Sequence, residues 1–213
     1  MTTLIIDPLA EADYLADRRA KGLDRYDEVW DGVYIVSPLP EYYHQEIVGD
    51  LNSCLQTALR RQKLGRVVPG CNISDRAGDW MQNYRCPDVV VFLTTTTAKF
   101  HGAHWEGGPD FAVEVVSEND RTWDKLDFYA KVGTRELLIV DRKPWQLTLL
   151  RLQEGSFIEV GTSTQTDQVE LPSAVIPFTF RLVKQPYGPA IEIKNVTDGQ
   201  ISYAPADPPL PTA

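Results

Sequence analysis

The 213-residue sequence predicts one mixed α/β (α+β) domain, with helices flanking a central mixed β-sheet. Two uninterrupted apolar runs, FAVEVV at 111–116 and ELLIV at 136–140, are typical of strands covered on both faces. A helical pattern at 122–132 lies between them, and Gly133 ends it. Strand, helix and strand together predict a βαβ unit with parallel strands and a right-handed crossover.

The elements before this unit are indicated by caps, turns and periodicity. A helix is expected at 7–22, with Asp7 able to cap it, and a hairpin follows because two extended runs meet at the type I′ dipeptide Asp31-Gly32. The longest helix is expected at 43–64, where apolar residues recur at three-to-four spacing. Short β-rich runs after it predict strands at 66–68, 72–74 and 89–93.

The end of the chain divides into a hairpin and a tail. WQLTLLRL and SFIEV flank the turn at Glu154-Gly155 and predict a hairpin at the periphery of the sheet. From Pro186 onward prolines recur, and the terminal APADPPLPTA has no apolar periodicity. We therefore expect a single domain at 1–185, including the amino-terminal helix and hairpin, and a loosely ordered tail at 186–213.

Composition narrows the class of protein. No apolar run approaches the length of a membrane span, and the first residues lack the basic start of a secretory signal, so a cytoplasmic protein is expected. Three cysteines without C-x-x-C spacing favour neither a disulfide framework nor a zinc site. The net charge of −9 argues against tight nonspecific attraction to a polyanion, although a local cationic groove or a bound cation overrides net charge near a site.

Two carboxylates in the apolar strands need an explanation. Strand alternation places Glu114 with Ala112 and Val116, so its side chain is expected to be semi-buried and to have either a structural ion pair or a functional partner. Asp88 precedes the apolar run VVVFL, where a turn residue bonding nearby amides is the simpler interpretation. Together they supply two hard oxygen ligands for Mg²⁺ or Mn²⁺, with the carbonyl of Val115 as a third.

Lys125 lies near the start of the predicted helix at 122–132, on the edge of its buried face. A solvated lysine is one interpretation. The other is that the helix packs on the strand of Glu114 and directs the amine toward the carboxylates. There it would orient or help to deprotonate a water, or offset charge developing on a phosphate.

These residues resemble a known family. The order CPDVVVF, FAVEVVSEND, DKLDFYAKVG and ELLIVD resembles the PD-(D/E)XK nuclease superfamily and, more narrowly, its Uma-two (Uma2) family of restriction-endonuclease-like proteins, abundant in cyanobacteria. The resemblance covers most of the chain, including DEVWDGVYIVSP and the histidine that follows it. It implies a restriction-endonuclease-like fold with a metal-binding pair at Asp88 and Glu114.

The active-site lysine departs from the superfamily pattern. Val116 occupies the usual lysine position of the E-x-K motif, and the family variant moves that lysine to the following helix, which matches Lys125. Glu28 matches an acidic position of the family, whereas an exposed strand carboxylate is the alternative. His44, at the start of the long helix, is either a capping or core histidine or a group that approaches a phosphate or a metal-bound water.

The expected activity is that of a metal-dependent endonuclease hydrolysing DNA phosphodiester bonds, with Asp88, Glu114, Lys125, Glu28 and His44 as the catalytic constellation. Mg²⁺ or Mn²⁺ is the expected cofactor, DNA the expected substrate and a homodimer the expected assembly. A catalytically inactive nuclease-fold module that binds nucleic acid or protein is the principal rival, and the net acidity favours it. A phosphodiesterase acting on another substrate is a third reading.

Overall fold

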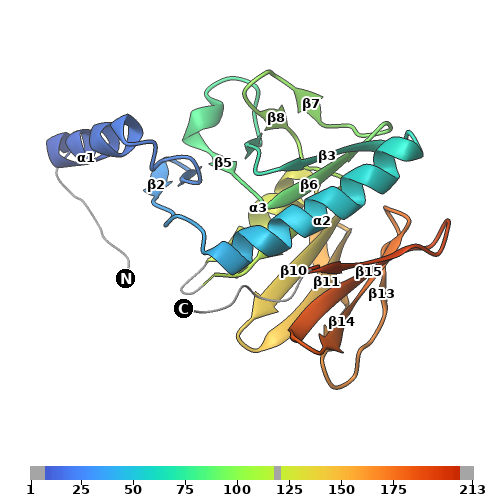
Figure 1. Ribbon diagram of the computed structural model, residues 1–213. Coiled ribbons are helices and arrows are strands. Elements are labelled where there is room, and N and C mark those ends of the chain that lie inside the picture. Colours follow the sequence, from blue (N-terminus) through green and yellow to red (C-terminus); the bar gives the residue numbers. More distant parts are fainter. Residues whose placement is uncertain (1–7, 118–120, 207–213) are drawn as a thin grey trace.

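A six-stranded mixed sheet forms the centre of the chain in the computed structural model, which describes residues 8–117 and 121–206 (Figure 1). Strands β9 and β10 are parallel and the other neighbours are antiparallel, which confirms the predicted mixed sheet and the βαβ unit. In spatial order the strands are β12 (Ser156–Thr164), β11 (Trp145–Gln153), β10 (Glu136–Arg142), β9 (Phe111–Val115), β6 (Val89–Leu93) and β3 (Gly65–Pro69).

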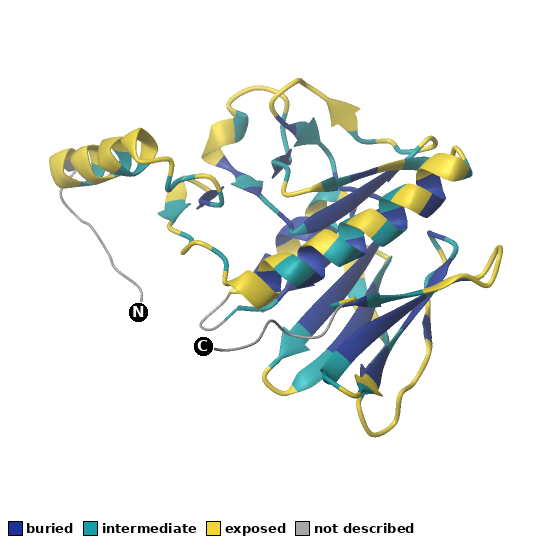
Figure 2. Cartoon of the chain, in the orientation of Figure 1, coloured by how far each residue is buried: buried dark blue, intermediate teal, exposed yellow. Residues whose placement is uncertain are grey.

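Helices cover the two faces of this sheet. The long helix α2 (Tyr42–Arg61) presents its buried stripe to one face, as Figure 2 shows, because its apolar residues recur every three or four positions. The 3₁₀ turn η2 (Thr122–Lys125) and helix α3 (Leu126–Val132) follow β9, and α3 packs on the opposite face. Gly133 ends α3 with a φ of 85°, a conformation that favours glycine. None of the described helices is long and apolar enough to cross a membrane.

A smaller sheet of short strands lies beside the central one. Its hairpin turns at Asp31 and Gly32, whose φ values of 47° and 85° confirm the predicted type I′ geometry. Helix α1 (Pro8–Ala20) precedes it, and the predicted cap Asp7 lies outside the described residues. In spatial order the strands are β2 (Val33–Ile35), β1 (Glu28–Trp30), β5 (Tyr84–Arg85), β4 (Ile73–Ser74), β8 (Trp105–Glu106) and β7 (Lys99–Phe100), with the 3₁₀ turn η1 (Trp80–Gln82) before β5.

The carboxy-terminal region corrects the predicted domain boundary. The prediction of a tail beginning at 186 is wrong for residues 188–204, because they form strands β15 (Gly188–Asn195) and β16 (Ile201–Ala204). These two strands belong to a third sheet, which also contains β13 (Leu171–Pro172) and β14 (Phe178–Gln185). Pro186 belongs to the turn between β14 and β15, where a proline supports the hairpin. The rings of Phe111 and Phe180 stack at 5.6 Å and join this sheet to the central core. Residues 207–213 of the predicted tail lie outside the described residues.

Gly108 lies where the loop before β9 meets the end of α3. Its N–H donates to the carbonyl of Val132 at 2.6 Å, and a Cβ added there would lie 2.4 Å from the backbone nitrogen of Thr134. We expect Gly108→Ala to lower the free energy of unfolding in urea by about 1–3 kcal/mol, because backbone must shift to admit the methyl group. Gly78→Ala, whose Cβ would meet nothing within 4 Å, is the control, and equal stability of the two variants would contradict this packing.

Candidate active site

Asp88 lies directly before β6, where this strand meets the end of β9. Its Oδ2 accepts the backbone N–H of Val115 at 2.7 Å, and its Oδ1 lies 2.9 Å from Nε2 of His44. The N–H and C=O of one strand residue point to the same side, so the carbonyl of Val115 also faces Asp88. The turn interpretation was therefore partly right, because Asp88 does bond a backbone amide, but that amide belongs to the neighbouring strand.

His44 joins Asp88 to the end of β9. The imidazole is 5% exposed in the first turn of α2, and its Nδ1 lies 3.2 Å from the hydroxyl of Ser117. An ionised carboxylate only accepts hydrogen bonds, so Nε2 carries the hydrogen toward Asp88, and in the neutral ring Nδ1 accepts from Ser117. The three side chains form a hydrogen-bonded row that fixes the orientation of the Asp88 carboxylate.

Lys125 connects two buried carboxylates from different sheets. Its Nζ lies 3.2 Å and 3.3 Å from the two oxygens of Glu114 and 3.1 Å from Oε1 of Glu28. The Lys125 side chain is 10% exposed and the carboxylates are 3% and 4% exposed, so solvent screens these contacts little. The solvated-lysine interpretation is wrong, because η2 and α3 pack on the face of the sheet that carries Glu114.

Glu28 is held from three directions. Besides Lys125, it accepts from the indole Nε1 of Trp30 at 2.7 Å and from the backbone N–H of Cys86 at 2.8 Å. The alternative of an exposed strand carboxylate is therefore wrong. The small sheet turns this side chain inward, since β5 pairs with β1 and leads directly to Cys86 and Asp88.

Glu114 is the least solvated acid of the group. The pKa of Glu114 is raised to about 8, and burial is the largest cause. The charges of Asp88 and Glu28 also raise it, whereas Lys125 and the hydroxyl of Tyr129 lower it. Tyr129 donates a short hydrogen bond to Glu114 Oε1, and burial also raises the pKa of this phenol. The site thus concentrates more negative charge than a single ammonium group offsets.

Comparisons with known proteins identify the family and the fold of the chain. The model of the Uma2 family, described as "Putative restriction endonuclease", matches residues 14–182. The chain belongs to the Uma2 family. A crystal structure titled as a "putative nuclease belonging to DUF820" from Anabaena variabilis covers 70% of this chain and 82% of its own, with a TM-score of 0.57 and 17% identity. At that identity it shows the fold, which confirms the predicted restriction-endonuclease-like class. Among curated proteins, none matches the sequence significantly.

The Uma2 site offers oxygen ligands suited to a hard divalent cation. Asp88, Glu114 and the carbonyl of Val115 provide such oxygens. The pKa of Glu114 is raised chiefly by burial and also by the charges of Asp88 and Glu28, and a bound cation would favour the ionised carboxylate. Within the described ranges no group of three or more His, Cys, Asp or Glu side chains is arranged to hold a metal. Two carboxylates and a carbonyl have the chemistry for such an ion, but Lys125 and Tyr129 would have to release part of Glu114 before it could bind.

Sequence reasoning missed the contacts that support these ligands. Tyr129 was not among the candidate residues, yet its hydroxyl donates a hydrogen bond to Glu114. Its spacing of four from Lys125 was the available signal, because residues i and i+4 share one helix face. The partnership of Trp30 with Glu28 had a local signal, because residues i and i+2 of a strand point to the same face. The partnership of Ser117 with His44 had none, since the two residues are far apart in the sequence.

The hydroxyl of Tyr129 should tune the protonation of Glu114. Because its hydrogen bond lowers the pKa of Glu114, we expect Tyr129→Phe to raise that pKa above its value of about 8 in the metal-free protein. The ¹³C chemical shift of the Glu114 carboxyl, followed through a pH titration, measures this change. Tyr187→Phe, which alters a hydroxyl bonded to the carbonyl of Ala206, is the control. An unchanged or lower midpoint in Tyr129→Phe would contradict the role of the hydroxyl.

Proposed function

We propose that this Uma2 chain is a metal-dependent endonuclease that hydrolyses phosphodiester bonds of DNA. The single observation that carries the proposal is the convergence of Glu114 and Lys125, at 3.2 Å, beside the ordered carboxylate of Asp88. Family membership and the shared fold support a nuclease function. The position of the amine agrees with the lysine that the family carries on its helix.

Asp88, Glu114 and the carbonyl of Val115 are the groups that would hold Mg²⁺ or Mn²⁺. Such an ion, when bound, lowers the pKa of a coordinated water and stabilises charge on phosphate oxygens. His44 and Ser117 keep Asp88 in one orientation, so that its carboxylate needs little reorganisation. Lys125 places a positive charge between Glu28 and Glu114, where it orients the attacking water or offsets charge on the scissile phosphate.

DNA as substrate and a homodimer as the active assembly are parts of this proposal. The family description supports a nucleic-acid substrate, and two copies would place two sites against the two strands of a duplex. Light scattering of the purified chain tests the assembly, and a monomer would remove the dimer from the proposal. The cytoplasmic location stays a prediction.

The experiment combines substrates, ions and matched variants. Plasmid, single-stranded and branched DNA are incubated with Mg²⁺, Mn²⁺ or EDTA, and cleavage is expected with either ion and absent in EDTA. Asp88→Ala should abolish it, whereas Glu159→Ala, a change of an exposed carboxylate on β12, should not. Full cleavage by Asp88→Ala, or cleavage of equal rate in EDTA, would refute the proposed mechanism.

The second candidate is a catalytically inactive module that binds nucleic acid or protein. It is favoured by the engagement of Glu114 with Lys125 and Tyr129, which satisfies the carboxylate without an ion. Calorimetric titration with Mn²⁺ separates the two candidates. Binding that is lost in Asp88→Ala supports the nuclease, and no binding up to millimolar Mn²⁺ supports the inactive module.

A further inference from the structure

Arg121 is an exposed cation stacked at the edge of the acidic site. Its guanidinium carbon lies 4.4 Å from the ring centroid of Trp30, whose indole donates to Glu28. Four residues later on the same segment, Lys125 turns inward to Glu28 and Glu114. One short stretch of chain thus supplies a buried cation to the carboxylates and an exposed one beside them.

The Trp30 ring is a rigid support for this cation. A second guanidinium, that of Arg85, lies 4.5 Å from the same centroid and also stacks on Phe128 at 4.2 Å. Arg85 is 4% exposed and its Nη1 donates to the carbonyl of Val29 at 3.0 Å, so it belongs to the interior. Stacking on an aromatic ring restricts a guanidinium to one plane while leaving its edge available for hydrogen bonds.

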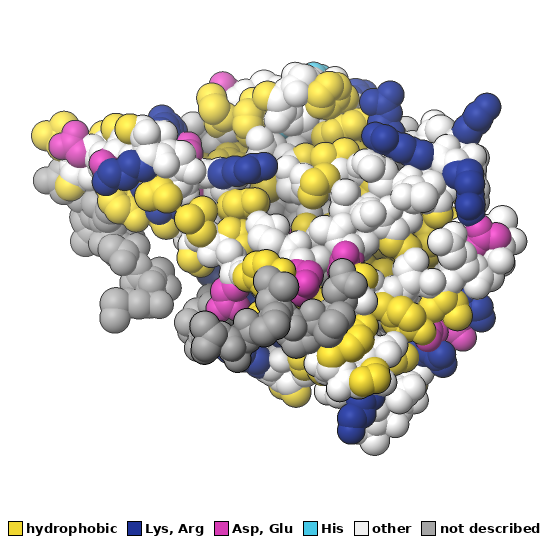
Figure 3. All heavy atoms as spheres, viewed as in Figure 1, with side chains coloured by type: hydrophobic (Ala, Val, Ile, Leu, Met, Phe, Trp, Pro, Cys, Tyr) yellow, Lys and Arg dark blue, Asp and Glu magenta, His cyan; other side chains and the backbone are white. Residues whose placement is uncertain are grey.

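Because the chain is acidic overall, an exposed cation beside the site matters for the binding of a polyanion. The net charge is −9, and on the face shown in Figure 3 the Lys and Arg side chains lie in separate groups rather than in one continuous basic band. Three carboxylates at the site would repel a phosphate backbone. A polyanion must therefore be attracted locally, by individual cations close to the site.

Arg121 suits this role better than the other arginine near the end of β9. Arg142 is 14% exposed and donates to the carbonyl of Val116 and to Glu41. The Arg121 side chain is 48% exposed, and besides its stacking on Trp30 it donates from Nε to Asp124 at 2.8 Å. A guanidinium has five N–H donors, so a second anion can bind along its outer edge.

We propose that Arg121, held on Trp30, is the substrate-binding residue that contacts a backbone phosphate of the nucleic acid beside the scissile bond. The inference rests on the proposed function for the identity of the polyanion. It adds the residue that attracts the polyanion to an acidic protein, and Asp124 competes with the phosphate for the same guanidinium.

The test measures binding separately from cleavage. A short fluorescein-labelled DNA duplex is titrated in EDTA with the full-length chain carrying Glu114→Gln, and anisotropy is recorded over a range of NaCl concentrations. Adding Arg121→Ala should weaken binding about tenfold, because one charged hydrogen-bonding contact is lost. The slope of log K against log salt should become shallower by about one.

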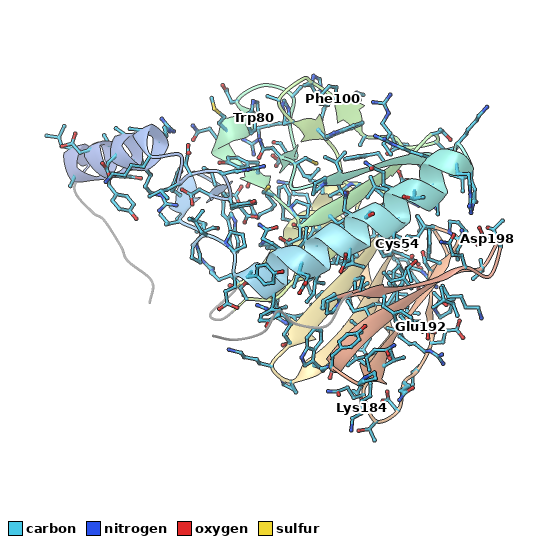
Figure 4. All side chains as sticks on the ribbon, in the orientation of Figure 1. Cys54, Trp80, Phe100, Lys184, Glu192 and Asp198 are labelled. Atoms are coloured by element: carbon cyan, nitrogen blue, oxygen red, sulfur yellow. The ribbon has the colours of Figure 1, made fainter. Side chains whose placement is uncertain are left out.

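Three further variants distinguish phosphate binding from a packing role. Arg121→Lys should retain the salt slope of the Glu114→Gln parent, because the positive charge is kept. Asp124→Asn should tighten binding several-fold, because it removes the carboxylate that competes for the guanidinium. Lys184→Ala removes an exposed charge near the end of β14 in the third sheet, where Figure 4 labels it, and should change neither quantity. Melting temperatures report whether any variant is unfolded.

Each outcome bears on this proposal independently of the nuclease proposal. An Arg121→Ala chain that binds with unchanged affinity and salt slope overturns the role of Arg121, as does a parent chain that does not bind the duplex. A wild-type protein that binds DNA through Arg121 but never cleaves it refutes the proposed activity alone.

Discussion

Glu114→Gln is expected to reduce DNA cleavage about a thousandfold or more while stabilising the metal-free fold at alkaline pH. Cleavage falls because the amide is a poor ligand for a hard divalent ion, whose contribution to the barrier is several kcal/mol. The stability effect follows from burial, which raises the pKa of Glu114 to about 8. The two effects have opposite signs and come from one carboxylate.

The sign of the pH dependence follows from proton binding. Glu114 has a higher pKa in the folded chain than in the unfolded chain, so the folded state holds the proton more tightly. Its contribution to stability is complete below the unfolded pKa, near 4.5, and is lost as the pH rises through about 8. The loss is at most about 1.4 kcal/mol per pH unit, and Glu114→Gln should remove it.

Urea unfolding at a series of pH values in EDTA measures this effect. The wild-type curve should fall between pH 5 and 8 relative to that of Glu114→Gln, with Glu159→Gln as the control for an exposed carboxylate. Mn²⁺ titrations of the wild type should show tighter binding as the pH approaches 8, because the ion displaces a proton. Parallel stability curves for wild type and Glu114→Gln would contradict the raised pKa.

The parts of the fold that could be predicted are those encoded over short stretches. The βαβ unit followed from two continuous apolar runs, and the hairpin at Asp31-Gly32 from a dipeptide that favours positive φ. The third sheet was missed because its prolines were interpreted as disorder. The alternation of apolar and polar residues from Ile191 to Lys194, with Pro186 in the turn, was the opposing signal.

The site could be predicted in its membership but not in its contacts. Asp88 and Glu114 are recognisable because carboxylates beside apolar strands need partners. The partners themselves come from distant segments, so no local pattern indicates that Lys125 contacts both Glu28 and Glu114. The resemblance to the family supplied Glu28, His44 and Lys125 as candidates, and the structure brings all three to the same place.

Lys125→Met is expected to destabilise the metal-free protein more than any other single change at the site. The thioether fills a similar volume but leaves Glu28 and Glu114 buried together without a cation. Breaking one side of a buried charge pair costs about 3–5 kcal/mol. Urea unfolding in EDTA at pH 9, above the pKa of about 8 of Glu114, measures this cost with the carboxylate ionised. Lys21→Met, which breaks the exposed pair with Asp17, is the control and should change stability little.

The double variant Lys125→Met with Glu114→Gln separates charge from packing. If the cost is an uncompensated buried charge, removing the Glu114 charge should restore part of the lost stability, and the two changes should not be additive. DNA cleavage should be low in the single and in the double variant. Lys125→Met alone should reduce the cleavage rate about a hundredfold or more relative to the wild type, because the proposed role of the amine is to act on the water or the phosphate. Additive losses of stability would instead show that Lys125 contributes through its methylene packing, and the bridge between the two carboxylates would then carry little of the fold's stability.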